Sequence, residues 1–147
     1  DWQWHVYGNG ETFDDIKALV EKEGLEGQLK LMGNNPNVLS LYRDYSLFVL
    51  PSYREGLPLV LLEAKANGLP IVSFNIDTGP CEMVEDGVNG FLIEPYDTDK
   101  MAEKLSLLAD DDDLRRKFSQ NAGRWMDKFD KQKIKSQWIE LIESLSK

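Results

Sequence analysis

Short apolar runs alternate with amphipathic stretches along the chain, and this alternation constrains its fold more than any other feature. The apolar runs that have strand length are 3–7, 29–32, 47–50, 70–74 and 90–93. The stretches expected to be helical are 12–23, 38–45, 58–67 and 79–85, then three segments from Asp97 onward that break near Asp110 and Phe129. Strands alternating with helices pair in parallel through right-handed crossovers. We therefore expect an α/β fold, a Rossmann-like doubly wound parallel sheet with helices on both faces.

Composition excludes several classes of protein. Seventeen basic and 26 acidic residues give a net charge of −9, which argues against nucleic-acid binding and against docking on an anionic membrane surface. No run approaches the roughly 18 apolar residues that a membrane-spanning helix needs, so we do not expect this part of the protein to be membrane-inserted. A single cysteine, Cys81, and a single histidine, His5, argue against disulfides and structural zinc and fit a reducing cytoplasm.

The 147 residues suit one domain, and no linker, repeat or low-complexity tract divides them. We therefore predict one domain over residues 1–147 that ends in helices over residues 97–147. The sequence begins with Asp1 rather than Met, and a strand-like run follows at once. We expect the chain to be part of a longer protein.

The segment 51–64 begins where the most apolar expected strand ends, which is the edge where doubly wound sheets bind ligands. Gly56 permits a tight turn, and Pro58 suits the first position of a helix. Three backbone N–H groups at the start of this helix have no partner within it, those of Leu57, Leu59 and Val60. Together with the helix dipole they favour an anion.

Two glutamates flank this helix start. Glu55 precedes the helix, and Glu63 lies about 7 Å beyond Pro58 along its axis at the standard rise per residue. A carboxylate at that depth can accept hydrogen bonds from the paired hydroxyls of a ribose, as acidic residues do in dinucleotide folds. The pattern favours a nucleoside diphosphate with its ribose near Glu63 and a hydroxyl-rich group near Glu55.

The two glutamates, seven residues apart, resemble the E-x7-E motif of retaining glycosyltransferases of family 4, which have the two-domain GT-B architecture. The resemblance covers most of the chain from residue 4 to about 120. Further segments resemble that family in its order: 7–11, 32–34, 50–52, 63–64 with 68–72, 79–82 and 86–93. The overall pattern is similar to bacterial enzymes that build O-antigen and capsular polysaccharide.

The resemblance implies a role for each matching residue. It implies that Glu63 binds the ribose and that Glu55, the candidate catalytic residue, contacts the donor sugar near the reacting carbon. It implies that four backbone amides face the sugar and diphosphate, those of Gly56, Leu57, Leu59 and Val60. The turn at Met32 and Gly33 is implied to lie against the base. The family needs no divalent metal and no cofactor beyond its nucleotide-sugar substrate.

The resemblance also implies what lies outside this sequence. The chain matches the C-terminal, donor-binding half of a GT-B enzyme without its first strand–helix unit, which carries the family's diphosphate-gripping Arg and Lys, and without the N-terminal acceptor domain. We expect this half alone to be inactive, because those parts supply much of the transition-state stabilisation. The intact enzyme is expected to transfer a hexose or N-acetylhexosamine from a UDP-sugar to a lipid-linked glycan with retention, on the cytoplasmic face of the inner membrane.

Plainer interpretations remain open for these residues. Glu55 could be a solvated loop acid and Glu63 a surface residue. The acidic run 110–113 is better explained by a helix dipole than by a metal, and the apolar residues of 125–142 by packing rather than by a partner groove. A non-catalytic receiver-like signalling module is the alternative function, but it would need an acidic cluster and a lysine at strand ends, where Leu50 is instead followed by Pro51 and Ser52.

Overall fold

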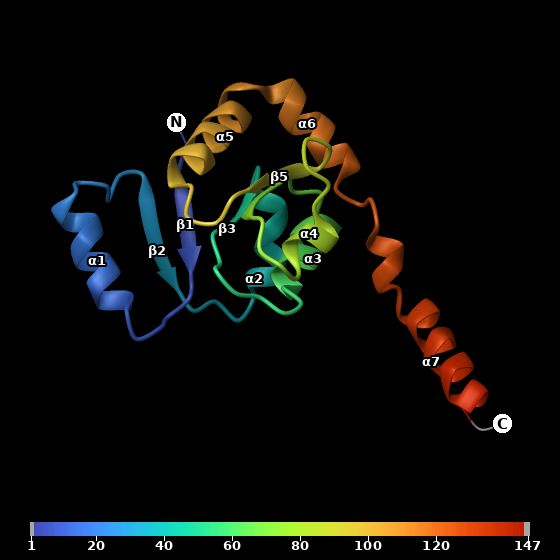
Figure 1. The fold of residues 1–147 in the computed structure, drawn as a ribbon. Coiled ribbons are helices and arrows are strands. Elements are labelled where there is room, and N and C mark those ends of the chain that lie inside the picture. Colours follow the sequence, from blue (N-terminus) through green and yellow to red (C-terminus); the bar gives the residue numbers. More distant parts are fainter. Residues whose placement is uncertain (1, 146–147) are drawn as a thin grey trace. The chain divides into compact units, whose positions relative to one another are not determined.

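The structure is a computed structural model that describes residues 2–145 (Figure 1). It divides into two compact units, one up to Leu41 and one from Tyr42 onward. The first unit contains β1 (Trp4–Tyr7), α1 (Phe13–Lys22), β2 (Leu29–Gly33) and α2 (Val38–Leu41). Its two strands pair in parallel, and α1 forms the crossover between them.

Helix α1 begins without a side-chain cap. Thr12 stands at the N-cap of α1, but its side chain makes no capping hydrogen bond. Its backbone has φ −91° and ψ 9°, whereas an N-cap residue that bonds the first turn is normally extended. Thr12 and Asp15 therefore form no capping box, and α1 begins at Phe13, one residue later than predicted.

The second unit begins with a 3-10 turn, η1 (Tyr42–Asp44), and continues as an alternating α/β structure. Its next elements are β3 (Phe48–Leu50), α3 (Leu59–Ala66), β4 (Ile71–Phe74), α4 (Pro80–Met83) and β5 (Gly90–Ile93). All three strands are parallel, in the order β3-β4-β5. The carboxyl ends of the strands therefore meet at one edge of the sheet, where the loop before α3 and the loop before α4 begin.

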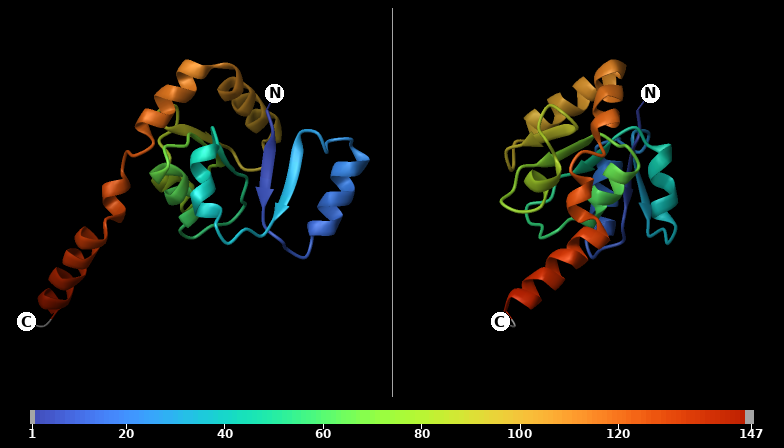
Figure 2. Two further views of the ribbon diagram at one scale, coloured as in Figure 1. Left: turned by 180° about the vertical axis from the view of Figure 1, so that it is seen from behind. Right: turned by 90° about the vertical axis from the view of Figure 1, so that its right-hand side faces the viewer.

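The C-terminal elements are α5 (Thr98–Asp110), α6 (Asp112–Asn121), η2 (Met126–Phe129) and α7 (Lys131–Leu145). The breaks at Asp111 and at Asp130 fall where the sequence predicts them, but α6 already ends at Asn121, which the sequence did not predict. The acidic run caps α6, since the Asp111 carboxylate accepts a hydrogen bond from the Leu114 N–H at 2.8 Å. The packing expected of α7 is wrong for this chain, because α7 projects from the sheet with no buried residue and Trp138 is 61% exposed (Figure 2).

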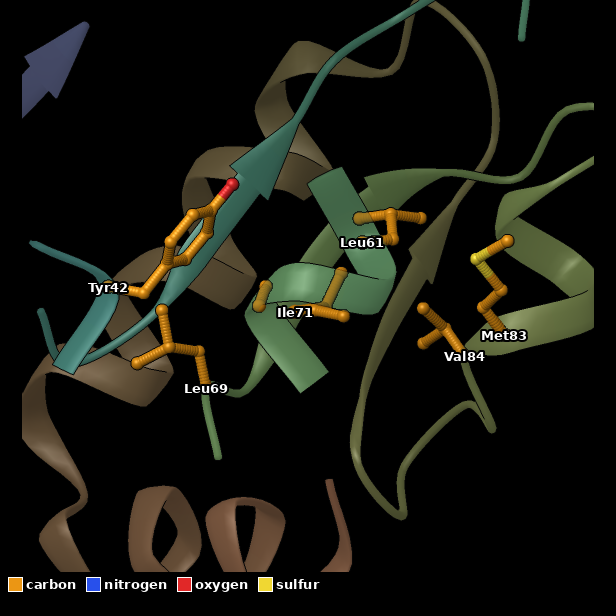
Figure 3. Close-up of a cluster of buried hydrophobic side chains, with 7 residues drawn as sticks. Tyr42, Leu61, Leu69, Ile71, Met83 and Val84 are labelled. Atoms are coloured by element: carbon orange, nitrogen blue, oxygen red, sulfur yellow. The ribbon is translucent and has the colours of Figure 1, made fainter. Parts of the chain in front are cut away.

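Two apolar clusters cover the two faces of the β3-β4-β5 sheet. The first joins α3 and α4 to the sheet and includes Tyr42, Leu61, Leu69, Ile71, Met83 and Val84 (Figure 3). The second joins α5 and α6 to the sheet and includes Val72, Phe74, Ile93, Met101, Leu108 and Phe118. Neighbouring residues of β4, Ile71 and Val72, belong to opposite clusters, as the alternation of side chains along a strand requires. A parallel sheet covered by helices on both faces is thus confirmed for this unit.

The expected single sheet is not formed within the described residues. Their strands form one sheet of two strands, β1-β2, and one of three, β3-β4-β5. The parallel α/β class is confirmed, but β1 and β3 each have one hydrogen-bonded neighbour strand, β2 and β4 respectively. The difference arises because no described strand pairs with both β1 and β3.

Gly90 allows β5 to approach β4 closely. A Cβ atom added at Gly90 would lie 2.3 Å from the Ile71 carbonyl oxygen and 2.9 Å from a methyl carbon of Val84. The first of these is a backbone atom within a sheet, which cannot move without breaking the strand pairing. Gly123, in the same unit, has nothing within 4 Å of the corresponding position.

We predict that Gly90→Ala lowers the free energy of unfolding by about 1–3 kcal/mol, the usual cost of overpacking a core. Chemical denaturation of the two purified proteins measures the difference. Gly123→Ala is the matched control and should stay within about 1 kcal/mol of the wild type. Equal stabilities of the Gly90 and Gly123 variants would contradict the packing described for β5.

Lys65 is a charged residue in the core of the second unit. It lies on α3, is 2% exposed, and its Nζ donates a hydrogen bond to the Met83 carbonyl at 2.5 Å. Burial lowers the pKa of Lys65 from 10.5 to about 8, while nearby Glu85 opposes the shift and Lys128 adds to it. The uncharged amine can still donate to Met83, so loss of the proton does not break this contact.

This shift predicts how stability depends on pH. Between pH 8 and 10 the folded chain has released the Lys65 proton that the unfolded chain still binds, so the free energy of unfolding should rise with pH. The slope from one proton cannot exceed about 1.4 kcal/mol per pH unit. Denaturation at several pH values should show this rise in the wild type and in Lys117→Met, which changes an exposed lysine, but not in Lys65→Met. A rise of the same size in Lys65→Met would contradict the assignment.

Candidate active site at the start of α3

The start of α3 presents open backbone donors at the carboxyl edge of the sheet. Helix α3 begins at Leu59, one residue later than predicted, because Pro58 is extended (φ −73°, ψ 92°) and acts as the N-cap. Within residues 2–145, no acceptor takes the N–H groups of Gly56, Leu57, Leu59 or Val60. Since Pro58 has no N–H of its own, these four amides are the donors that the helix start can offer to a ligand.

The apolar residues of α3 separate into a buried face and an exposed tip. Leu61 and Ala64 are fully buried against β3 and β4, whereas Leu59 is 60% and Leu57 52% exposed. The first turn therefore has an exposed side, whereas the body of α3 contacts the sheet, α4 and η2. The tip is therefore open while the body of the helix is anchored.

The loop between β4 and α4 contacts the loop between β3 and α3, which contains Glu55. The Thr78 hydroxyl donates a hydrogen bond to the Glu55 carbonyl oxygen at 2.5 Å. Gly79, with φ +90°, comes so close that an added Cβ would lie 2.6 Å from Cδ of Pro58 and 3.0 Å from the Gly56 carbonyl oxygen. Only glycine readily combines this backbone conformation with this approach. The sequence predicts that Gly79 lies at the start of a helix, but it does not indicate this contact with the loop before α3.

The Glu63 carboxylate lies on the body of α3 and is partly buried. Its Oε2 accepts a hydrogen bond from the Tyr42 hydroxyl at 2.8 Å. Burial raises the pKa of Tyr42, and the hydrogen bond to Glu63 raises it further, so the phenol remains a donor at neutral pH. The Glu55 side chain is also partly buried, in the loop just before the helix. In chain order, Glu55 precedes the open amides and Glu63 follows them.

The predicted site residues fall in both units. Six of them lie together around the start of α3 in the second unit: Glu55, Gly56, Leu57, Leu59, Val60 and Glu63. Met32 and Gly33 lie in the first unit, at the carboxyl end of β2. Met32 is exposed, and Gly33 has φ +66°, a conformation that favours glycine and that follows the register shift in the pairing with β1.

The motif 86–90 has a structural role in this chain. The Asp86 carboxylate accepts a hydrogen bond from the Leu92 N–H at 2.9 Å, and the buried Asn89 side chain accepts one from the Glu85 N–H at 2.9 Å. These bonds close the turn before β5 and place Gly90 at its start. The polar side chains of this segment therefore stabilise the turn that leads into β5.

A polar pocket of about 370 Å³ lies at the other end of α3, next to Asn67 and Gly68. Two of its three arginines are already engaged: Arg115 bonds Asp112 and the carbonyls of α5, and Arg116 pairs with Asp113. The pocket also lies at the amino end of β4, away from the edge where doubly wound sheets bind ligands. We therefore place the candidate site at the start of α3.

Other chemistries find little support in the described residues. Within residues 2–145, no group of three or more His, Cys, Asp or Glu side chains is arranged to hold a metal ion. His5 lies within hydrogen-bonding distance of Gln3, at 3.3 Å, and Cys81 is exposed. Over the same residues, no helix has the length and apolar character that crossing a bilayer requires.

Known bacterial proteins resemble this chain in sequence and in fold. The chain is 32% identical over 143 residues to the poly(ribitol-phosphate) alpha-N-acetylglucosaminyltransferase of Staphylococcus aureus, covering 97% of this chain and 29% of that protein. It is 36% identical over 107 residues to the UDP-Gal:alpha-D-GlcNAc-diphosphoundecaprenol alpha-1,3-galactosyltransferase of Escherichia coli, covering 72% and 27%. A variant of S. aureus TarM, crystallised with fondaparinux, alpha-GlcNAc-glycerol and UDP, superposes with a TM-score of 0.90 at 32% identity, covering 95% of this chain and 28% of that one.

The chain spans between 15% and 40% of the length of the curated relatives it matches. Its fold agrees with the C-terminal domains of GT-B glycosyltransferases, as the resemblance implied. The family described as glycosyl transferases group 1 matches residues 1–125. The chain therefore belongs to the group 1 glycosyltransferases.

Proposed function

We propose that this chain is the donor-binding half of an enzyme that transfers a hexose or N-acetylhexosamine from a UDP-sugar, with retention at the anomeric carbon. The observation that carries the proposal is the start of α3, where four backbone amides have no acceptor within residues 2–145, with Glu55 just before them in the chain and Glu63 further along the helix. Backbone donors at a helix start suit a diphosphate, and carboxylates suit sugar hydroxyls. UDP is also the nucleotide bound by the TarM variant that this chain resembles.

Each residue has a distinct role in this proposal. The amides of Gly56, Leu57, Leu59 and Val60 bind the diphosphate and stabilise the charge that develops on it as the sugar departs. Glu63 accepts hydrogen bonds from the ribose.

Glu55 orients the donor sugar near the reacting carbon, and the turn at Met32 and Gly33 lies against the base. The diphosphate is stabilised by the helix dipole and by basic side chains, and no divalent metal is required.

The intact enzyme needs parts that this chain does not contain. We propose that a strand–helix unit preceding β1 supplies the basic residues that grip the diphosphate. In the doubly wound order 3-2-1-4-5-6, the first strand lies between the second and the fourth. That position would suit a strand beside β1, which has one sheet neighbour within residues 2–145. A further N-terminal domain would bind the acceptor, so this half alone would be inactive.

The acceptor in this proposal is a lipid-linked glycan of a bacterial surface polysaccharide, such as O-antigen or capsule. The E. coli relative supports it, because its name describes transfer to a sugar on diphosphoundecaprenol. The intact enzyme would act as a peripheral protein at the cytoplasmic face of the inner membrane. A donor screen with a lipid-linked acceptor, followed by NMR of the anomeric configuration of the product, tests the sugar and the retention.

The receiver-like alternative has no specific observation in its favour. A receiver would need an acidic cluster and a lysine at the strand ends, but β3 is followed by Pro51 and Ser52. The membership of the chain in a glycosyltransferase family also favours the enzyme. Amide NMR shifts with UDP, GDP, ADP and acetyl phosphate distinguish the two, since only a receiver reacts with acetyl phosphate.

Removing the Glu63 carboxylate tests the ribose assignment. We predict that Glu63→Ala weakens UDP binding to the intact protein by about 1.5–3 kcal/mol, the usual loss for charge-assisted hydrogen bonds. Isothermal titration calorimetry measures the change. Glu140→Ala removes an exposed carboxylate on α7 and should leave the affinity unaltered. Unchanged UDP affinity in Glu63→Ala would show that the ribose binds elsewhere.

A further inference from the structure

We propose that Tyr42 is a positioning residue that holds the Glu63 carboxylate in the orientation needed to bind the two ribose hydroxyls of the donor. The inference rests on the proposed function and adds a residue that the sequence motifs did not include. Its basis is the 2.8 Å hydrogen bond from the Tyr42 hydroxyl to Oε2 of Glu63, which joins residues 21 positions apart.

The Tyr42 ring is packed in the core of the second unit. It is 6% exposed and belongs to the cluster formed with Leu61 and Leu69 (Figure 3). It also packs against the Phe48 ring, with 5.7 Å between the ring centroids. Tyrosine has only two side-chain torsions, and core packing holds both. The hydroxyl is therefore a fixed point in the second unit.

Glu63 has no comparable anchor of its own. No cation among residues 2–145 forms an ion pair with its carboxylate, and α3 fixes only its backbone. A glutamate side chain loses considerable rotamer freedom when it is ordered. The bond from Tyr42 orders the carboxylate before a ligand arrives, so that the ligand does not bear this cost.

The oxygen atoms of Glu63 suffice for this arrangement. A carboxylate offers about four acceptor positions on two oxygens. Tyr42 occupies one position on Oε2, which leaves Oε1 and the second position of Oε2 for two hydroxyl donors. A ribose carries two adjacent hydroxyls, and this chemistry distinguishes it from a deoxyribose.

The test compares the binding of UDP and of 2′,3′-dideoxy-UDP to the intact protein by calorimetry. The dissociation constant of the dideoxy nucleotide divided by that of UDP measures how much the protein uses the ribose hydroxyls. Tyr42→Phe keeps the ring and removes the hydroxyl. We expect it to reduce this ratio about threefold to tenfold, the worth of one hydrogen bond, and to change the affinity for the dideoxy nucleotide less than about twofold.

Two control variants separate this role from others. Glu63→Ala should bring the ratio close to one. Tyr96→Phe removes a hydroxyl from an exposed ring that stacks on Tyr53, and it should keep the wild-type ratio. Thermal unfolding of each variant checks that the fold is retained.

Three results would overturn the inference, and they differ in what else they affect. If Tyr42→Phe keeps the wild-type ratio while Glu63→Ala brings it to one, Tyr42 does not position Glu63. The proposed function then still stands. Equal losses for both nucleotides in Tyr42→Phe would assign Tyr42 to the fold alone. A ratio near one in the wild type would show that the ribose assignment of Glu63 itself is wrong.

Discussion

The close approach of Gly79 to Pro58 is the contact on which the candidate site depends. It brings the loop after β4 against the loop after β3, and the Thr78 hydroxyl bonds the Glu55 carbonyl beside it. Both loops leave the same edge because β3 and β4 are parallel. The start of α3 is thus supported from the neighbouring strand, and its open amides are held in place by backbone and ring atoms.

Helix α3 serves the core and the candidate site at once. Leu61 and Ala64 are buried against the sheet, Glu63 turns toward Tyr42, and Lys65 reaches the carbonyl of Met83. Each polar group that α3 buries has a hydrogen-bond partner, as the cost of burying polar groups requires. The anchoring of the helix body explains how an exposed tip can be rigid, and rigidity is what a preorganised anion site needs.

Much of the site could be predicted from sequence because its elements are local. Glu55, Gly56 and the start of α3 lie within one short segment, and the spacing of Glu55 from Glu63 follows from the helix rise. The contacts of Thr78, Gly79 and Tyr42 could not be predicted in the same way. Each joins positions about 20 residues apart, and only the register of the strands and the packing of the core decide which side chains meet.

Sequence by itself determined the α/β class, the parallel pairing and the family, because hydrophobic period and turn residues are properties of neighbouring positions. Tertiary structure decided how the strands group into two sheets and which side of α3 is buried. It also decided which hydrogen bonds the 86–90 segment makes in the turn before β5. These outcomes depend on which apolar surfaces, distant in sequence, pack against each other and are buried from water. The sequence pattern shows which residues are apolar, but not which residues they contact.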